Sequence, residues 1–379
     1  MDPVATRKEA STSAPALYMA IESGERRWKL GFSIGMGQRP RIRVVEARDL
    51  ERLAAEIGAA KARFKVPQEA PVLSCYEAGR DGFWLHRALT RMGVHNLVVD
   101  SSSIEVNRRA RRAKSDKLDV VKLGEQLIRY HAGEQRVWSV VRVPTPEQED
   151  RRQLQRELMT ARRDRGRLVV RIKSLLAGQG VKAGPRGALP QQLASLRMWN
   201  AQPLPERLLQ RLGRETAKAQ LLDQQIRELE RQRKHWLRTA SDRGVDLVRR
   251  LLKVRGIGPE TAWLLAMELF SWRRFNNGRE LGALVGLCPT PHQSGTIRRE
   301  LGITKAGNRH VRAQLIEIAW GWLQYQPQSA LTRWYDQKYA TAGPVQRKKG
   351  IVAVARKLLI ALWHYVEHDQ PIQGAVLKA

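Results

Sequence analysis

Three short stretches near the start of the chain are rich in apolar residues and bounded by turn residues, which predicts three β-strands. They span residues 17–21, 28–34 and 42–46, and glycine-containing turns separate the first two. A helical pattern follows from Asp49 to about Lys65, where leucine, alanine and isoleucine recur at helical spacing. The chain therefore begins with three strands and then a helix.

Two more strands follow, at 72–76 and 96–100, with a helix between them at about 82–92. Three strands followed by alternating helix and strand is the order of an RNase H-like sheet. We therefore predict an α/β domain of RNase H-like (RuvC-like) fold over residues 16–145, after a disordered tail at 1–15. A further helix is expected from Asp116 to about Tyr130.

The middle of the chain carries two heptad patterns, at 154–175 and 208–236, separated by a Gly/Pro-rich stretch at 178–190. Two heptad helices of similar length predict an antiparallel coiled-coil arm, or a coil that joins two subunits, over residues 146–243. A plain helical bundle is the alternative.

The remaining residues, 244–379, predict a helical C-terminal domain. Within it, residues 251–265 resemble a helix-hairpin-helix segment, in which glycines allow a close backbone approach and a helix N-terminus favours an anion. Arg255, Gly256 and Gly258 are the candidate phosphate-binding residues of this segment. A simple helix–turn–helix connection would give the same pattern. The last helix is expected at about 349–365.

The net charge of the chain indicates the class of its binding partner. Lys and Arg total 68 against 37 Asp and Glu, a net charge of +31, which indicates a polyanionic partner, most commonly nucleic acid. No run of about 18 apolar residues is present, so we expect no membrane span, and we expect no export. Cys75 and Cys288 lack metal-site or disulfide spacing. We expect a bacterial cytoplasmic protein, associated with the nucleoid.

One short stretch concentrates this charge. Residues 107–117 carry six cations in eleven positions. The candidate nucleic-acid contacts here are Arg108, Arg109, Arg111, Arg112 and Lys114.

Four carboxylates near this stretch form a candidate metal site. Glu22 and Glu77 end the first and fourth predicted strands, and Asp116 and Asp119 share one face of the following helix. In an RNase H-like sheet the first and fourth strands are neighbours, so the four acids would meet and require a cation, for which Mg²⁺ is the natural choice. Each acid taken alone could equally be an exposed residue, or a helix cap at Asp116.

Ser294 lies on a Ser-Gly turn that is followed by a run of cations. Such a serine is either a phosphate-binding hydroxyl or a nucleophile that attacks phosphorus, and the metal-site candidates favour attack. The cations are Arg298, Arg299, Lys305, Arg309 and Arg312.

Three motifs together resemble a known family. Glu77-Ala-Gly, the stretch 114–119 and the stretch 286–312 are similar to those of the DEDD-type transposases of the insertion-sequence one-ten and eleven-eleven group, which are bridge-RNA-guided serine recombinases. The likeness covers nearly the whole chain, in the order RuvC-like domain, coiled coil and C-terminal transposase domain.

The resemblance implies a role for each matched residue. Ser294 would be the nucleophile that forms a phosphoserine link to DNA. Glu77, Asp116 and Asp119 would be the second, third and fourth metal-binding acids, and Glu22 stands where the family has aspartate. The implied cofactor is Mg²⁺ or Mn²⁺. The implied partners are donor and target DNA, a guide (bridge) RNA, and further copies of this chain in a homodimer that assembles to a tetramer.

Two other functions remain open. A RuvC-like hydrolytic nuclease would use the acids to activate water, with Ser294 binding phosphate only. A nucleic-acid-binding scaffold would bind DNA and RNA through the same cations without cleaving either.

Overall fold

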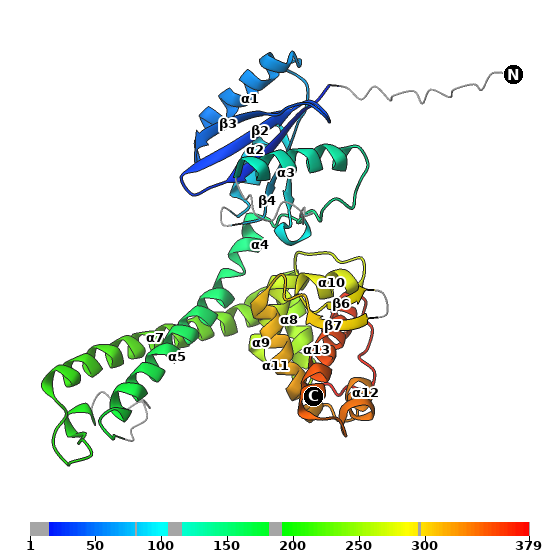
Figure 1. The fold of residues 1–379 in the computed structure, drawn as a ribbon. Coiled ribbons are helices and arrows are strands. Elements are labelled where there is room, and N and C mark those ends of the chain that lie inside the picture. The colour runs from blue at the N-terminus through cyan, green and yellow to red at the C-terminus, as the bar shows by residue number, and fades with distance from the viewer. Residues whose placement is uncertain (1–14, 80–81, 105–115, 182–191, 295–296, 379) are drawn as a thin grey trace. The chain divides into compact units, whose positions relative to one another are not determined.

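The computed structural model describes residues 15–79, 82–104, 116–181, 192–294 and 297–378, except for the side chains of 102, 116–117, 291–294 and 297–301. The chain forms two compact units, residues 1–143 and residues 144–379. Both are drawn in Figure 1. The stretch 146–243, expected as a region of its own, is part of the second unit.

The first unit is built on a mixed five-stranded sheet in the order β3-β2-β1-β4-β5. Strand β1 pairs antiparallel with β2, which pairs antiparallel with β3, whereas β1, β4 and β5 run parallel. The predicted strands are confirmed, with ends shifted by one or two residues. Their bounds are β1 (Leu17–Ser23), β2 (Arg27–Ser33), β3 (Arg41–Glu46), β4 (Val72–Glu77) and β5 (Val94–Val99).

Helices cover both faces of this sheet (Figure 1). Helices α1 (Leu50–Phe64) and α2 (Trp84–Arg91) bury one face, against the odd-numbered residues of β1 and the even-numbered residues of β4. Helix α3 (Asp116–His131) buries the other face. Alternation of side chains along each strand divides the two cores in this way, and each large apolar side chain buried contributes about 1.5–3 kcal/mol.

The second unit begins with α4 (Pro146–Asp150) and a long helical pair, α5 (Gln153–Ala177) and α7 (Glu206–Thr239). Three ion pairs show that α5 and α7 are antiparallel, because residues of increasing number on α5 contact residues of decreasing number on α7. They are Arg162–Glu230, Arg165–Asp223 and Arg171–Glu215. The two predicted heptad helices thus pair within one chain (Figure 1). Coiled-coil packing between them remains a prediction.

The body of the second unit is a bundle of helices around one apolar core. Its helices are α8 (Arg243–Lys253), α9 (Pro259–Leu265), the π-helix η4 (Ala266–Phe270), α10 (Gly278–Leu284), α11 (Arg309–Tyr325), α12 (Ala330–Tyr339) and α13 (Pro344–Glu367). Helix α13 starts five residues before the predicted position. Within the described residues, no helix has the length and apolar character needed to cross a membrane.

The sequence had predicted a helical domain over residues 244–379, and this prediction is wrong in one respect, because the domain also contains two strands. Strands β6 (Pro289–Ser294) and β7 (Ile297–Ile303) form an antiparallel hairpin beside the bundle. Two prolines in β6 and a glycine in β7 hide the strand pattern. The hairpin nevertheless forms, because it packs Ile303 against the core of the bundle.

Candidate active site

Glu22 and Glu77 lie side by side at the ends of two neighbouring parallel strands. The register of β1 and β4 pairs Ile21 with Tyr76, and each glutamate is the next residue along its strand. Side chains two residues apart on a strand share a face, so Glu22 lies on the face of Ala20 and Glu77 on the face of Cys75. The sequence had predicted this meeting of strand ends.

Helix α3 crosses that same face and runs antiparallel to β1, because His131 at the end of α3 lies beside Tyr18 near the start of β1, with ring centroids 6.1 Å apart. A Cβ atom at Gly124 would lie 3.8 Å from Cβ of Ala20, and one at Gly31, the strand partner of Ala20, would lie 2.9 Å from Cγ1 of Val120. The first turn of α3, which begins at Asp116, therefore extends past Val120 toward the Glu22 end of β1.

The charge of Glu77 affects its neighbour in the core. The Cys75 thiol is fully buried and lies 3.8 Å from the carbonyl oxygen of Leu123. Burial raises the pKa of this thiol, and the negative charge of Glu77 raises it further. Cys75 is therefore a packing residue, and the electrostatic effect agrees with a Glu77 carboxylate on the α3 side of the sheet.

The donor chemistry of this face suits a hard divalent cation, since carboxylate oxygens are the ligands that Mg²⁺ prefers. Glu22, Glu77 and Asp119 are each half-buried. Among the side chains that the structure describes, no three Asp, Glu, His or Cys groups lie close enough to hold a metal. The side chain of Asp116 is not among them, so the four-carboxylate site remains a prediction.

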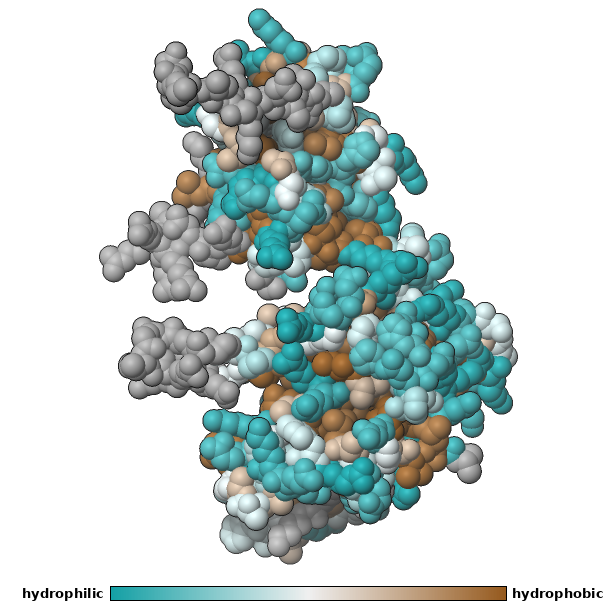
Figure 2. Space-filling view, turned by 90° about the vertical axis from the view of Figure 1, so that its right-hand side faces the viewer, coloured by the Kyte–Doolittle hydropathy of each residue, from teal (hydrophilic) through white to brown (hydrophobic). Residues whose placement is uncertain are grey.

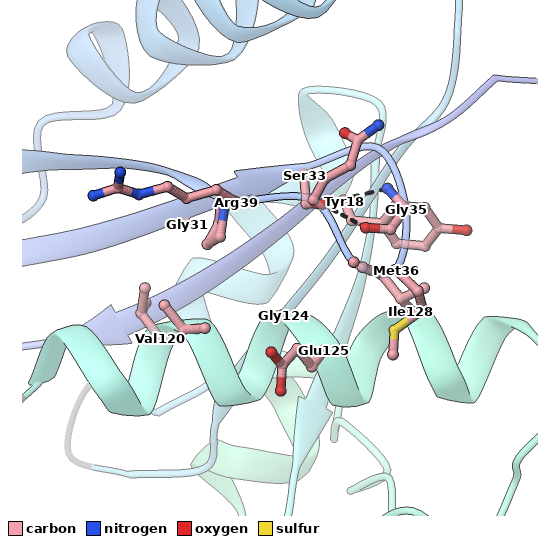
Figure 3. Close-up of a pocket in the computed structure, with 14 residues that line it drawn as sticks. Tyr18, Gly31, Ser33, Gly35, Met36, Arg39, Val120, Gly124, Glu125 and Ile128 are labelled. Atoms are coloured by element: carbon pink, nitrogen blue, oxygen red, sulfur yellow. Dashed lines mark hydrogen bonds between the residues drawn. The ribbon is translucent and has the colours of Figure 1, made fainter.

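A cavity of about 310 Å³ lies on the same face, near the opposite end of β1 (Figure 3). It is enclosed by β2, the loop 34–40 and α3, and its wall includes Tyr18, Met36 and Ile128. Arg39 and Glu125 bring opposite charges to it. None of the predicted site residues lines this cavity, and the sequence pattern had not led us to expect it. The glycines at 31, 35, 37 and 124 were the available signal, because they leave the space open.

Ser294 is the last residue of β6, at the tip of the hairpin, where it pairs with Ile297 of β7. The two positions between them lie outside the described residues, as do the side chains of Ser294, Arg298 and Arg299. Ser294 thus belongs to the second unit, whereas the four acids belong to the first.

The base of this hairpin is tightly built. A Cβ atom at Gly307 would lie 1.9 Å from the carbonyl oxygen of Leu284, and one at Gly286 would lie 2.1 Å from that of Ala306. Nη1 of Arg312 donates hydrogen bonds of 3.0 Å to the carbonyl oxygens of Val285 and Ala306. Arg312 therefore holds together the two chain segments that carry the hairpin. Its predicted contact with nucleic acid remains untested.

The predicted helix-hairpin-helix segment is formed by α8, a turn at 254–258 and α9. Arg255 is exposed. A Cβ atom at Gly256 would lie 3.2 Å from Cβ of Tyr325, so glycine allows a close approach here. The C-terminal residues close over one side of the turn, where Nζ of Lys378 donates to the carbonyl oxygen of Ile257. Gly258 caps α9 and has open space around it.

Of the other predicted nucleic-acid contacts, two lie within the described side chains. Lys305 and Arg309 are exposed, beside the hairpin base and at the start of α11. The cations of the 107–117 stretch fall outside the described side chains, so Arg108, Arg109, Arg111, Arg112 and Lys114 remain predictions.

Comparison with known proteins identifies the family. The sequence profile of the family described as "Transposase IS116/IS110/IS902 family" matches residues 248–334. The Sinorhizobium fredii protein named "Putative transposase y4rJ" is 40% identical over 376 residues, which cover 96% of this chain and 95% of that protein.

Two further relatives match shorter stretches. The "Probable family 20 transposase" of Pseudomonas aeruginosa is 30% identical over 55% of this chain and 60% of its own length. The "Transposase for insertion sequence element IS1328" of Yersinia enterocolitica is 34% identical over 37% of this chain and 40% of its own length. With a relative of 40% identity over almost its full length, this chain belongs to the IS116/IS110/IS902 family of insertion-sequence transposases.

Proposed function

We propose that this transposase is a serine recombinase that cuts and rejoins DNA through a phosphoserine link at Ser294, assisted by Mg²⁺ or Mn²⁺ on the four acids. The observation that carries the proposal is the adjacency of Glu22 and Glu77 on parallel strands, beneath a helix that begins at Asp116. An RNase H-like fold is part of the proposal, and the 3-2-1-4-5 strand order supports it.

The proposed reaction conserves the number of phosphodiester bonds. The Ser294 oxygen loses its proton and forms a bond to phosphorus, while the bond from phosphorus to the 3′ oxygen of the DNA breaks and that oxygen takes up a proton. A 3′-hydroxyl of a second strand then attacks the phosphoserine, which releases the serine and joins the new strands. A divalent cation, when bound, would supply stabilisation of the charge that develops on the phosphate.

The chain's own residues have two tasks in this scheme. The acids on the α3 face would hold the cation, and Glu22, one methylene longer than the aspartate of the family, would still supply a carboxylate. The hairpin would present Ser294, and Arg312 fixes the segments at its base. Lys305, Arg309 and the turn at Arg255–Gly258 would hold DNA phosphates.

We further propose a guide RNA that pairs with donor and target DNA, and a homodimer that assembles to a tetramer. The net charge of +31 supports this, since a protein that delegates sequence reading to RNA needs mainly to hold phosphate backbones. A bacterial cytoplasmic, nucleoid-associated protein fits these partners.

The proposal is tested by looking for protein joined to DNA. The protein, RNA transcribed from the flanks of its gene and nicked element-junction DNA are incubated with Mg²⁺ and run on a denaturing gel. We expect a DNA-linked protein band that Ser294→Ala abolishes and Thr290→Ala retains. Thr290 is the matched control, because its hydroxyl lies on the same strand and donates to the carbonyl of Gly302.

Two results would replace the proposal. Cut DNA without a linked band, lost in Glu77→Gln, would indicate a hydrolytic nuclease. Binding of DNA and RNA with no cleavage, unchanged in Glu77→Gln, would indicate a scaffold.

A further inference from the structure

The outer surfaces of α12 and α13 carry many cations and almost no acids. Asp336 is the single carboxylate between residues 330 and 358. Six cations are exposed there: Arg333 and Lys338 on α12, and Arg347, Lys348, Lys349 and Lys357 on α13. We call these six residues, together with Trp334 and Tyr339, the α12–α13 patch. Most of it lies beyond residues 248–334, which the family profile matches.

No described acidic side chain forms an ion pair with a cation of this patch. Among the described residues, the six cationic side chains form no ion pair and donate no hydrogen bond. The helical pair α5–α7 is different, because acids on the facing helix neutralise arginines such as Arg165 and Arg171. The α12–α13 patch is thus available to an external anion. Figure 2 shows a largely hydrophilic face over the second unit, with small hydrophobic areas between.

Two of the cations lie beside the same aromatic ring. Nζ of Lys357 lies 4.8 Å from the ring centroid of Trp334, and Nζ of Lys338 lies 5.9 Å from that centroid and 5.8 Å from the Tyr339 ring. Cation–π attraction favours each contact, but two ammonium groups beside one ring repel each other. A bound phosphate would relieve that repulsion.

The two helices hold this arrangement rigidly. A Cβ atom at Gly350 would lie 2.7 Å from the Tyr339 ring and 2.9 Å from the Tyr335 ring, so only glycine lets α12 approach α13 this closely. The Tyr335 hydroxyl also donates to the carbonyl oxygen of Arg347, at 3.4 Å. The cations therefore project from a preformed surface, which lowers the entropic cost of binding.

The spacing of the cations fits duplex DNA. Lys349 and Lys357 are eight residues apart on one helix, about 12 Å at 1.5 Å per residue. The major groove of B-form DNA is also about 12 Å wide, so the two ends of the patch can contact phosphates on both sides of it. The major groove of A-form RNA is too narrow for a helix to enter.

We propose that the α12–α13 patch is a docking surface for the phosphate backbone of duplex DNA. The inference deepens the proposed function and rests on it for the identity of the DNA, as donor or target. It does not depend on the chemistry at Ser294. Trp334 and Tyr339 act by positioning Lys338 and Lys357 for phosphate.

The test compares two pairs of substitutions that remove equal charge from exposed lysines. Lys338→Gln with Lys357→Gln alters the patch, and Lys173→Gln with Lys234→Gln alters the α5–α7 pair. Binding of the full-length protein to a fluorescent DNA duplex and to an RNA duplex of the same sequence is followed by anisotropy over a range of salt concentrations. Thermal melting checks that each variant is folded.

We expect the patch variant to bind DNA about tenfold more weakly at about 100 mM salt. The slope of log K for DNA binding against log salt concentration, called the salt slope here, should be smaller in magnitude by about 2, because each phosphate contact contributes about 0.9 to it. We expect the control variant to change little. Equal losses in both variants, an unchanged DNA slope, or a loss confined to RNA would each overturn the proposal. Ser294→Ala should bind DNA normally, so failure of the serine mechanism is distinguishable from failure of this surface.

Discussion

Glu22 and Glu77 occupy the same level of two neighbouring parallel strands, each one residue beyond the Ile21–Tyr76 pair. Neighbouring strands lie about 4.8 Å apart, so two carboxylates on the same face at this level repel each other unless a cation lies between or beside them. Lys29 of β2 is the register partner of Glu22 on its other side. A divalent cation on the Glu77 side would neutralise the remaining negative charge of the two carboxylates.

The first prediction concerns metal binding by these acids. We expect Glu77→Gln and Asp119→Asn each to weaken Mn²⁺ binding by about tenfold or more, because each removes a charged ligand. Isothermal titration with Mn²⁺ alone measures this without any need for activity. Glu125→Gln is the matched control, since it is an exposed carboxylate farther along α3. Equal affinity in all three variants would show that the acids do not bind the metal.

The second prediction concerns the base of the serine hairpin. Gly307 (φ +71°) and Gly302 (φ +95°) both adopt a left-handed backbone conformation, but only Gly307 faces an obstacle, the Leu284 carbonyl. We expect Gly302→Ala to lower the free energy of unfolding by about 1–2 kcal/mol through backbone strain alone. Gly307→Ala should cost at least about 3 kcal/mol, as strain and steric clash combine. Urea denaturation measures both, and equal costs would refute the close approach.

The third prediction separates two roles for Arg312. If it holds the hairpin base, Arg312→Ala should lower the free energy of unfolding by about 1–3 kcal/mol, because two backbone carbonyls lose a charged donor. Arg309→Ala, at an exposed position three residues earlier, should leave stability within about 0.5 kcal/mol. A stable Arg312→Ala protein with a reduced salt slope for DNA would assign Arg312 to phosphate binding instead.

The hairpin also marks the limit of what the sequence could predict. Strands β1–β5 were predictable as short apolar stretches bounded by turns, and the helical pair was predictable because its apolar residues recur every 3.5 residues. The hairpin lacks such a pattern, since Pro289, Pro291 and Gly302 interrupt it. Its stability depends on contacts far apart in sequence, such as Arg312 with Val285, which no local pattern encodes.

Some features of the candidate site were likewise predictable from the sequence, and others were not. Strand order was enough to predict that Glu22 and Glu77 are neighbours, because parallel pairing aligns strand ends. The structural role of Arg312 was not predictable, because a run of cations does not reveal which of them bonds to the backbone. The absence of a described acidic partner for Lys338 and Lys357 was not predictable either, because it depends on where the acids lie in the folded chain.

The fourth prediction concerns pH and the first unit. Ser74 Oγ donates to Asn96 Oδ1 at 2.7 Å, and Asn96 Nδ2 lies 3.0 Å from His86 Nδ1, which must be unprotonated to accept this hydrogen bond. Burial lowers the pKa of His86 by more than a backbone hydrogen bond with Asn96 raises it, and the charge of Arg87 lowers it further. Below its ordinary value of about 6.5 the unfolded chain therefore binds more protons than the folded chain, so stability falls as pH falls.

Urea denaturation at a series of pH values tests this. We expect the free energy of unfolding to decrease below about pH 6.5, and His86→Gln to decrease less steeply because it cannot titrate. The same pH dependence in both proteins would exclude His86 as a contributor.

The most direct test of the central claim is to identify the residue that carries DNA. The covalent complex is trapped on a DNA substrate in the presence of RNA and Mg²⁺, digested with nuclease and protease, and mapped by mass spectrometry. The fifth prediction is a nucleotide-modified peptide with the modification on Ser294. A modification on any other residue, or cleaved DNA with no modified peptide, would contradict the serine mechanism.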